Sequence, residues 1–181
     1  MANMTVSIGA TQLDLVEGDI AAQDTDAIVT AAHWDLGGGQ GTDGSVHFRA
    51  GPQLLEACAR IGGCPTGDAV ITEGFNLPAR YVIHAVGPVY EEGSEQEAEF
   101  LAGAYHNSLR VAVSHGLHSV SFPSISTGAF CFPCRSRLRL HCGRSSHSCR
   151  KRRTNSIWCG WCCIRVNSRK RSEYMGKRYG R

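Results

Sequence analysis

The chain has 181 residues and a formal net charge of +3, and this length is enough for one domain with a buried core. It contains no apolar run of about 18 residues and no basic stretch followed by an apolar core near its start, so neither a membrane span nor a secretory signal is predicted. We therefore expect a cytoplasmic protein with reduced thiols. The net charge combines two unlike parts, because residues 1–133 carry 15 of the 16 acidic residues and a net charge of −11, whereas residues 134–181 carry +14.

Residues 1–133 contain six segments with the patterns of β-strands. Alternating apolar and polar residues predict strands at 5–8 and 12–17. The run DAIVTAA supports a strand buried on both faces at 27–32. The remaining predicted strands are 68–72, 81–86 and 119–122.

Three helices are predicted between these strands, at residues 43–49, 52–61 and 95–115. In the second helix, Pro52 suits the first turn, and an apolar face is expected from Leu54, Leu55, Cys58 and Ile61. Strands that alternate with helices predict an α/β fold, a three-layer sandwich with the sheet in the middle. Ligands bind such sheets where loops gather at the carboxyl ends of strands.

Two glycine-bearing loops follow predicted strands. The first is GGGQGTDG at residues 37–44, and the second is SISTGAF at residues 124–130. Small residues let the backbone N–H groups of a loop turn toward one anion. Two such loops can hold a diphosphate from both sides, so the sequence predicts a ligand that contains a nucleoside diphosphate.

The tail, residues 134–181, has a different composition. It holds 15 basic residues, one acid (Glu173) and six of the nine cysteines, and it has no alanine, phenylalanine, proline or aspartate. One interpretation is a basic arm that binds nucleic acid or an acidic partner. A second is a zinc module built on two CxxC pairs, Cys131/Cys134 and Cys159/Cys162, with His141, Cys142, His147 and Cys149 between them.

A third interpretation of the tail is a shifted reading frame. An arginine codon CGN read one base later becomes GNN, which encodes Val, Ala, Asp, Glu or Gly. One permitted choice of codons for residues 134–144, shifted in this way, spells VDRASASTAAV, a plausible amphipathic helix. Enrichment in cysteine and arginine follows from the wrong frame of a GC-rich gene, which weakens the zinc interpretation. The three alternatives stay open on the sequence alone.

The order and spacing of five segments resemble the macro domain over residues 11 to about 133. The segments are LVEGDI (15–20), TDAIVTAAH (25–33), GGGQGTDGSVHFRAG (37–51), CPTGDAVITEGFNLPARYVIHAVGP (64–88) and SFPSISTGAF (121–130). The GGGxGxDGxxHxxAG form is similar to the MacroD-type class, which hydrolyses ADP-ribose esters. The resemblance implies a mixed central sheet between helices and a cleft for ADP-ribose or O-acetyl-ADP-ribose, with ADP-ribosylated proteins as further partners.

The resemblance also implies roles for individual residues. Asp19 is expected to bond the adenine amino group, with Ile20 beside the ring. Asp43 is expected to help orient or activate the attacking water. The diphosphate and the distal ribose are expected to contact Gly37, Gly38, Gly39, Gly41 and Thr42 of the first loop and Ser126, Thr127, Gly128, Ala129 and Phe130 of the second. No cofactor and no metal is expected.

Each of these residues also has a structural interpretation. Asp19 and Asp43 are also candidates for helix caps. His47 and His84 are expected to be hydrogen-bonded structural histidines. Cys58 and Cys64 are expected to be buried thiols rather than nucleophiles.

The chain departs from the family where MacroD-type domains have the sequence NAAN. Here the four residues are Thr30, Ala31, Ala32 and His33, so both asparagines are absent. The second asparagine normally bonds the distal ribose; His33 can make one such bond or act as a general base. Loss of one positioned polar contact commonly costs about 10²-fold in rate. We therefore expect recognition of ADP-ribose, with Thr30 among the binding residues, to be better preserved than hydrolysis.

The second departure is the tail, where the family continues with a helix and a strand that inserts into the sheet. Residues 135–153 have no apolar stripe suited to covering a sheet, and residues 157–166 (IWCGWCCIRV) are the only tail segment with the pattern of a strand. A missing central strand leaves backbone groups unpaired. With the tail as written, the sequence predicts an incomplete macro domain in residues 1–133 and a poorly folded product.

Three functions follow from these observations. The first is an enzyme that hydrolyses ADP-ribose esters, with Asp43 and His33 as its catalytic residues. The second is an ADP-ribose reader without turnover. The third is binding of nucleic acid through the basic tail.

Overall fold

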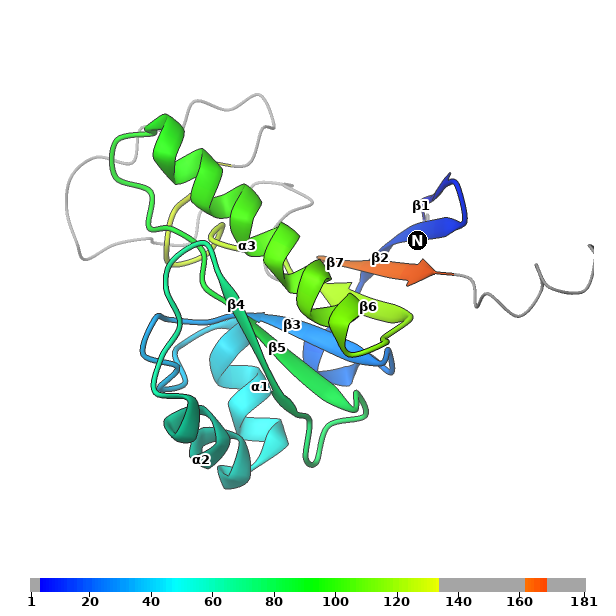
Figure 1. Cartoon of the computed structure of the whole chain (residues 1–181), viewed down its shortest axis with the longest axis horizontal. Coiled ribbons are helices and arrows are strands. Elements are labelled where there is room, and N and C mark those ends of the chain that lie inside the picture. Colours follow the sequence, from blue (N-terminus) through cyan, green and yellow to red (C-terminus); the bar gives the residue numbers. More distant parts are fainter. Residues whose placement is uncertain (1–3, 134–161, 169–181) are drawn as a thin grey trace, which may run out of the picture.

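The computed structural model describes residues 4–133 and 162–168, and in this part of the chain seven strands form one mixed sheet (Figure 1). The strands are β1 (Met4–Ile8), β2 (Thr11–Glu17), β3 (Ala27–Ala31), β4 (Ala69–Glu73), β5 (Tyr81–Ala85), β6 (Ser119–Phe122) and β7 (Cys162–Ser168). Their order across the sheet is β1-β2-β7-β6-β3-β5-β4. β3 runs parallel to β5 and β6, and all other neighbours are antiparallel.

Helices cover both faces of the sheet, which confirms the predicted three-layer sandwich. The helices are η1 (Ile20–Ala22, a short 3-10 helix), α1 (Thr42–Ala50), α2 (Pro52–Ile61) and α3 (Glu95–Ser114). Figure 1 shows α1 and α2 on one side of the sheet and α3 on the other. Alternate residues of a strand point to opposite faces, so Ile28 and Val82 pack with α1 and α2 while Val29 and Ile83 pack with α3.

The predicted elements of residues 1–133 are all present, with ends that differ by one residue at most. α2 spans Pro52–Ile61 as predicted, and the residue after it, Gly62, adopts the left-handed conformation. The expected apolar face of α2 is only half right. Leu54 and Cys58 are buried, whereas Leu55 and Ile61 are 47% and 39% exposed.

The tail supplies the strand that the sequence analysis expected to be missing. β7 lies between β2 and β6, antiparallel to both, and pairs along its whole length with β2 (Figure 1). It shares residues 162–166 with the segment singled out from the sequence. Ile164 and Val166 of β7 pack against the core on the α3 side. The central position in the sheet is therefore occupied.

Several predictions for the tail fall outside the described residues. One is that residues 135–153 have no apolar stripe. Another is the zinc module, because most of its proposed cysteine and histidine ligands lie outside the described residues. The basic-arm, zinc and reading-frame interpretations accordingly stay predictions. Within the described ranges, no helix is both long enough and apolar enough to cross a bilayer.

Candidate functional site: a cavity between two glycine-bearing loops

The two glycine-bearing loops meet at one cavity of about 910 Å³. The first loop leaves the carboxyl end of β3, and the second leaves the carboxyl end of β6, the parallel neighbour of β3. Parallel strands end at the same edge of a sheet, so the two loops face each other there. The predicted site residues that line the cavity are Asp19, Ile20, His33, Gly37, Gly38, Gly39, Gly41, Thr42, Asp43, Ser126, Gly128, Ala129 and Phe130.

Two predicted site residues do not line the cavity. Thr30 is fully buried in β3 beneath it, where its Oγ1 donates a hydrogen bond to Asp43 Oδ1 (3.0 Å). Thr127 turns its hydroxyl back into its own loop and donates to the Ser124 backbone oxygen (3.0 Å) and to Ser124 Oγ (2.8 Å). Both residues support the cavity through a neighbour.

Four lining residues were not predicted, namely Ala31, Asp35, Ser45 and Ser124, whereas Gln40 lies within the predicted binding range 37–41. All four lie in or next to the segments that were recognised, but the resemblance gave them no role. Asp35 did carry a local signal. An aspartate two residues before a glycine is typical of a side chain that accepts a bond from the backbone two positions on, and Asp35 Oδ1 accepts from Gly37 N (3.0 Å).

Backbone N–H groups of the second loop are available at the cavity wall. Within residues 4–133 and 162–168, the N–H groups of Thr127, Gly128 and Ala129 donate to no other group. The loop is held at its ends instead, where Phe132 N donates to Ser126 O (2.8 Å) and Tyr90 N donates to Phe130 O (2.9 Å). Unpaired N–H groups in a fixed loop form a concavity suited to anions.

Asp43 is a buried carboxylate with neighbours on both oxygens. It is 2% exposed and lies in the first turn of α1. Besides the bond from Thr30, its Oδ2 accepts from Gly39 N (2.7 Å). The first turn of a helix favours negative charge. The interpretation of Asp43 as the cap of α1 is wrong, because Gly41 occupies the N-cap position and the carboxylate bonds the preceding loop.

Asp19 has the structural role that was weighed for it. Its side chain caps η1 by accepting from Ala21 N (3.0 Å), and its Oδ2 forms an ion pair with Arg49 of α1 (2.8 Å). This ion pair connects the start of η1 with α1 at the cavity.

His33 and Asp35 form a pair at the cavity. His33 Nδ1 lies 2.9 Å from Asp35 Oδ1, and the two side chains are 47% and 51% exposed. The N–H of Gly37 and the bond to His33 hold the pKa of Asp35 below its ordinary value. Asp35 is therefore an ionised acceptor near neutral pH.

A second cluster lies behind Asp43, where His47, Cys58 and His84 bring one possible metal-ligand atom each to within 4.8 Å of one another. His84 is fully buried and Cys58 is 1% exposed. Burial lowers the pKa of His84 to about 3 and, with the charge of Asp43, raises the pKa of Cys58 to about 11. Thr72 Oγ1 lies 2.9 Å from His84 Nε2, which fits the predicted structural role of His84.

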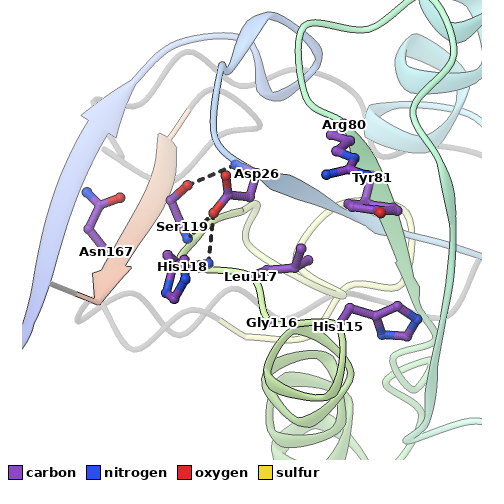
Figure 2. A pocket seen from close by; sticks show the side chains of 9 residues that line it. All are labelled: Asp26, Arg80, Tyr81, His115, Gly116, Leu117, His118, Ser119 and Asn167. Carbon is purple, nitrogen blue, oxygen red and sulfur yellow. Dashed lines mark hydrogen bonds between the residues drawn. The ribbon is translucent and has the colours of Figure 1, made fainter. Parts of the chain in front are cut away.

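A smaller cavity of about 460 Å³ lies at the opposite end of β3, β5 and β6 (Figure 2). Asp26 accepts there from the backbone N–H groups of His118 (2.7 Å) and Ser119 (2.9 Å), and Ser119 Oγ accepts from Asp26 N (2.8 Å). Arg80 and His115 come from different elements and lie apart in Figure 2. These bonds join the loop before β6 to the start of β3, and the polar side chains do not converge on one point.

The chain matches the sequence model of the macro domain over residues 29–140. It is 52% identical over 118 residues to a macro domain-containing protein of Chlorobaculum tepidum, an alignment that covers 65% of this chain and 69% of the relative. It is 50% identical over 126 residues to the O-acetyl-ADP-ribose deacetylase of Escherichia fergusonii, covering 67% of this chain and 71% of that one.

Solved structures give the same result. The macrodomain of Oceanobacillus iheyensis with ADP superposes with a TM-score of 0.70 at 42% identity, covering 73% of each chain. The macrodomain of Trypanosoma brucei in complex with ADP-ribose superposes with a TM-score of 0.60 at 43% identity, covering 65% of this chain and 48% of the other.

Proposed function

Because the chain belongs to the macro domain family, we propose that it binds ADP-ribose in the cavity between residues 37–44 and 124–130. The observation that carries this proposal is the pair of opposed loops, one of which presents three backbone N–H groups that have no partner among the described residues. A diphosphate has acceptor oxygens on both phosphorus atoms, so it matches donors on two sides of a cavity. Two similar solved structures hold ADP and ADP-ribose.

The adenosine end of the ligand would lie at Asp19 and Ile20, as the resemblance implies. Each oxygen of Asp19 already has one partner, Ala21 N or Arg49, and a carboxylate oxygen has a second lone pair for the adenine amino group. The distal ribose would lie toward His33, Asp43 and Phe130, all of which line the cavity.

We further propose that the chain hydrolyses an ester on the distal ribose, releasing acetate from O-acetyl-ADP-ribose or a modified acidic side chain from ADP-ribose. Two similar proteins carry the name O-acetyl-ADP-ribose deacetylase. Asp43 would orient the attacking water, and its bonds from Thr30 and Gly39 fix the carboxylate for that task. Loop N–H groups would bind the diphosphate and orient the ribose.

A second candidate function is an ADP-ribose reader without turnover. Thr30 favours this alternative, because it stands where the resemblance expects an asparagine, is fully buried outside the cavity lining and uses its hydroxyl for Asp43. His33 replaces the other asparagine. A reader needs only the loops, whereas a hydrolase also needs the polar groups at the ribose.

Calorimetric titration with ADP-ribose tests the binding proposal, with Gly128→Val as the informative variant. A Cβ at Gly128 meets no atom within 4 Å, so the new side chain extends into open space at the cavity without disturbing the fold. We expect the affinity to fall by about tenfold or more. Ala102→Val on the exposed side of α3 is the matched control and should leave the affinity unchanged.

Absence of binding by the wild-type protein, or equal binding by Gly128→Val, would contradict the proposed site. Acetate release from O-acetyl-ADP-ribose then separates the two functions. Turnover supports the hydrolase, and binding without turnover supports the reader.

A further inference from the structure

We propose that His33 and Asp35 act as a pair that carries the proton during ester hydrolysis, with His33 Nε2 as the general base and Asp35 as its positioning residue. The inference rests on the proposed hydrolysis and assigns a role to Asp35, which the sequence analysis did not single out. Both side chains line the cavity, and their contact at 2.9 Å is the geometry of a histidine oriented by a carboxylate.

The contact fixes which ring nitrogen carries hydrogen. An ionised carboxylate only accepts hydrogen bonds, so Nδ1–H of His33 donates to Asp35 Oδ1. In the neutral ring, Nε2 is then the nitrogen with a free lone pair. Within the described ranges, Nε2 has no protein partner. The nitrogen that can take a proton is therefore the one not used by Asp35.

Asp35 is itself held in place. Its Oδ1 accepts from Gly37 N, and a Cβ added at Gly37 would lie 3.4 Å from both carboxylate oxygens. The pair is thus part of the same loop that contributes Gly37, Gly38 and Gly39 to the cavity. A diphosphate seated on this loop would bring the distal ribose close to the pair.

The charges around the pair are few. Asp43 is another carboxylate that lines the cavity; both of its oxygens already accept hydrogen bonds, and His47 Nε2 lies 3.8 Å from its Oδ1. Asp19 and Arg49 neutralise each other at the η1 side of the cavity. The second loop, residues 124–130, contributes no charged side chain. His33 is therefore the group suited to accept a proton, while Asp43 is suited to orient the water.

The step balances without a further reactant. Water oxygen bonds to the ester carbonyl carbon while His33 Nε2 takes one of its protons. The tetrahedral intermediate then breaks its bond to the ribose oxygen, and the protonated ring returns the proton to that oxygen. The products are a carboxylate, the free ribose hydroxyl and one proton released to solvent.

Acetate release from O-acetyl-ADP-ribose, measured from about pH 5 to 9, tests the pair. We expect an acid limb in the wild-type rate and its loss in His33→Gln, with kcat lowered about 10²-fold and KM changed much less. Asp35→Asn should lower kcat about tenfold or more, because an amide N–H can donate to Nδ1 and place the ring hydrogen on Nε2. Asp35→Glu should recover part of the rate.

Phe48→Ser is the control, since Phe48 is 88% exposed on α1 and has no assigned role. Nitrogen-15 NMR of His33 gives a readout without turnover. We expect the Nδ1–H form in the wild-type protein and a mixture of both forms in Asp35→Ala.

Three results would overturn the pair. If His33→Gln hydrolyses the ester at the wild-type rate and with the wild-type pH profile, His33 is not the general base, while the proposed hydrolysis stands. A predominant Nε2–H form of His33 contradicts the positioning by Asp35. Binding of ADP-ribose with no turnover by the wild-type protein removes both the hydrolysis and the pair and leaves the reader.

Discussion

At the residue scale, His84 shows how a polar side chain is accommodated in the core of this protein. Its ring is fully buried on the α1 and α2 side of the sheet, between Thr72 and Cys58. Burial disfavours the charged ring, and the neighbouring His47 adds to this effect, so the pKa of His84 falls from 6.5 to about 3. The folded protein therefore holds this ring neutral at pH values where the unfolded chain protonates it.

This shift predicts a loss of stability in acid. Between about pH 6.5 and 3 the unfolded state binds one more proton at residue 84 than the folded state, so the free energy of unfolding falls as the pH falls through this window. The slope approaches about 1.4 kcal/mol per pH unit for one proton. Denaturant unfolding at a series of pH values should show this slope, and His84→Gln should reduce it. His106→Gln, on the exposed side of α3, is the control and should keep it. An equal slope in all three proteins would refute the assignment.

At the element scale, helices and strands that depend on local sequence signals were predicted well. The start of α2 was predicted because Pro52 acts within the first turn. β3 was recognised as a central strand because its residues are apolar on both faces. The face of α2 was only half right, because Leu55 lies about 100° around the helix from Leu54 and Ile61 is the last residue of the helix.

The site was predicted where short motifs determine the backbone and missed where side chains meet across a loop. Loop residues that line the cavity, such as Gly38 and Gly128, follow from the motifs. The contact between His33 and Asp35 depends on how the loop turns back at Gly37, which two separate sequence positions do not specify. The inward turn of Thr30 likewise depends on its packing under Asp43.

The end of β5 also determines the shape of the second loop. A Cβ at Gly87 would lie 2.2 Å from Ser126 Oγ and 2.7 Å from Ile125 Cγ2, so any larger residue must displace the loop. We expect Gly87→Ala to lower the melting temperature and to weaken ADP-ribose binding by about tenfold, because one displaced loop costs roughly 1.4 kcal/mol of binding free energy. Ala102→Val, on the exposed side of α3, should change neither by much. Normal affinity in Gly87→Ala would show that this contact does not position the loop.

At the scale of the whole molecule, the stability of the sheet depends on a strand from the tail. β7 separates β2 from β6, so without it these two strands do not touch. The sequence analysis predicted a poorly folded product because it expected this position to lack a strand. With β7 in place, its side chains Ile164 and Val166 complete the core under α3.

Replacing one of these side chains tests that role. We expect Ile164→Thr to lower the free energy of unfolding by about 1–2 kcal/mol, because a hydroxyl replaces an ethyl group at a partly buried position. Ile8→Thr makes the same substitution on β1, where the side chain is 62% exposed, and should change stability by less than about 0.5 kcal/mol. Thermal or denaturant unfolding of both variants gives the comparison. Equal stability of the two variants would mean that β7 does not belong to the cooperative core.

The position of β7 also affects how the protein folds during its synthesis. Synthesis makes residues 4–122 first, and at that stage β2 and β6 are two open edges with no neighbour between them. β7 can pair with β2 and β6 only after Ser168 has left the ribosome. Until then, each of these two strands has one unpaired edge that can form hydrogen bonds with another strand. During this interval, a strand of another protein or of a second nascent chain can pair at the position of β7. We therefore expect the yield of folded protein to depend on how fast the tail is translated.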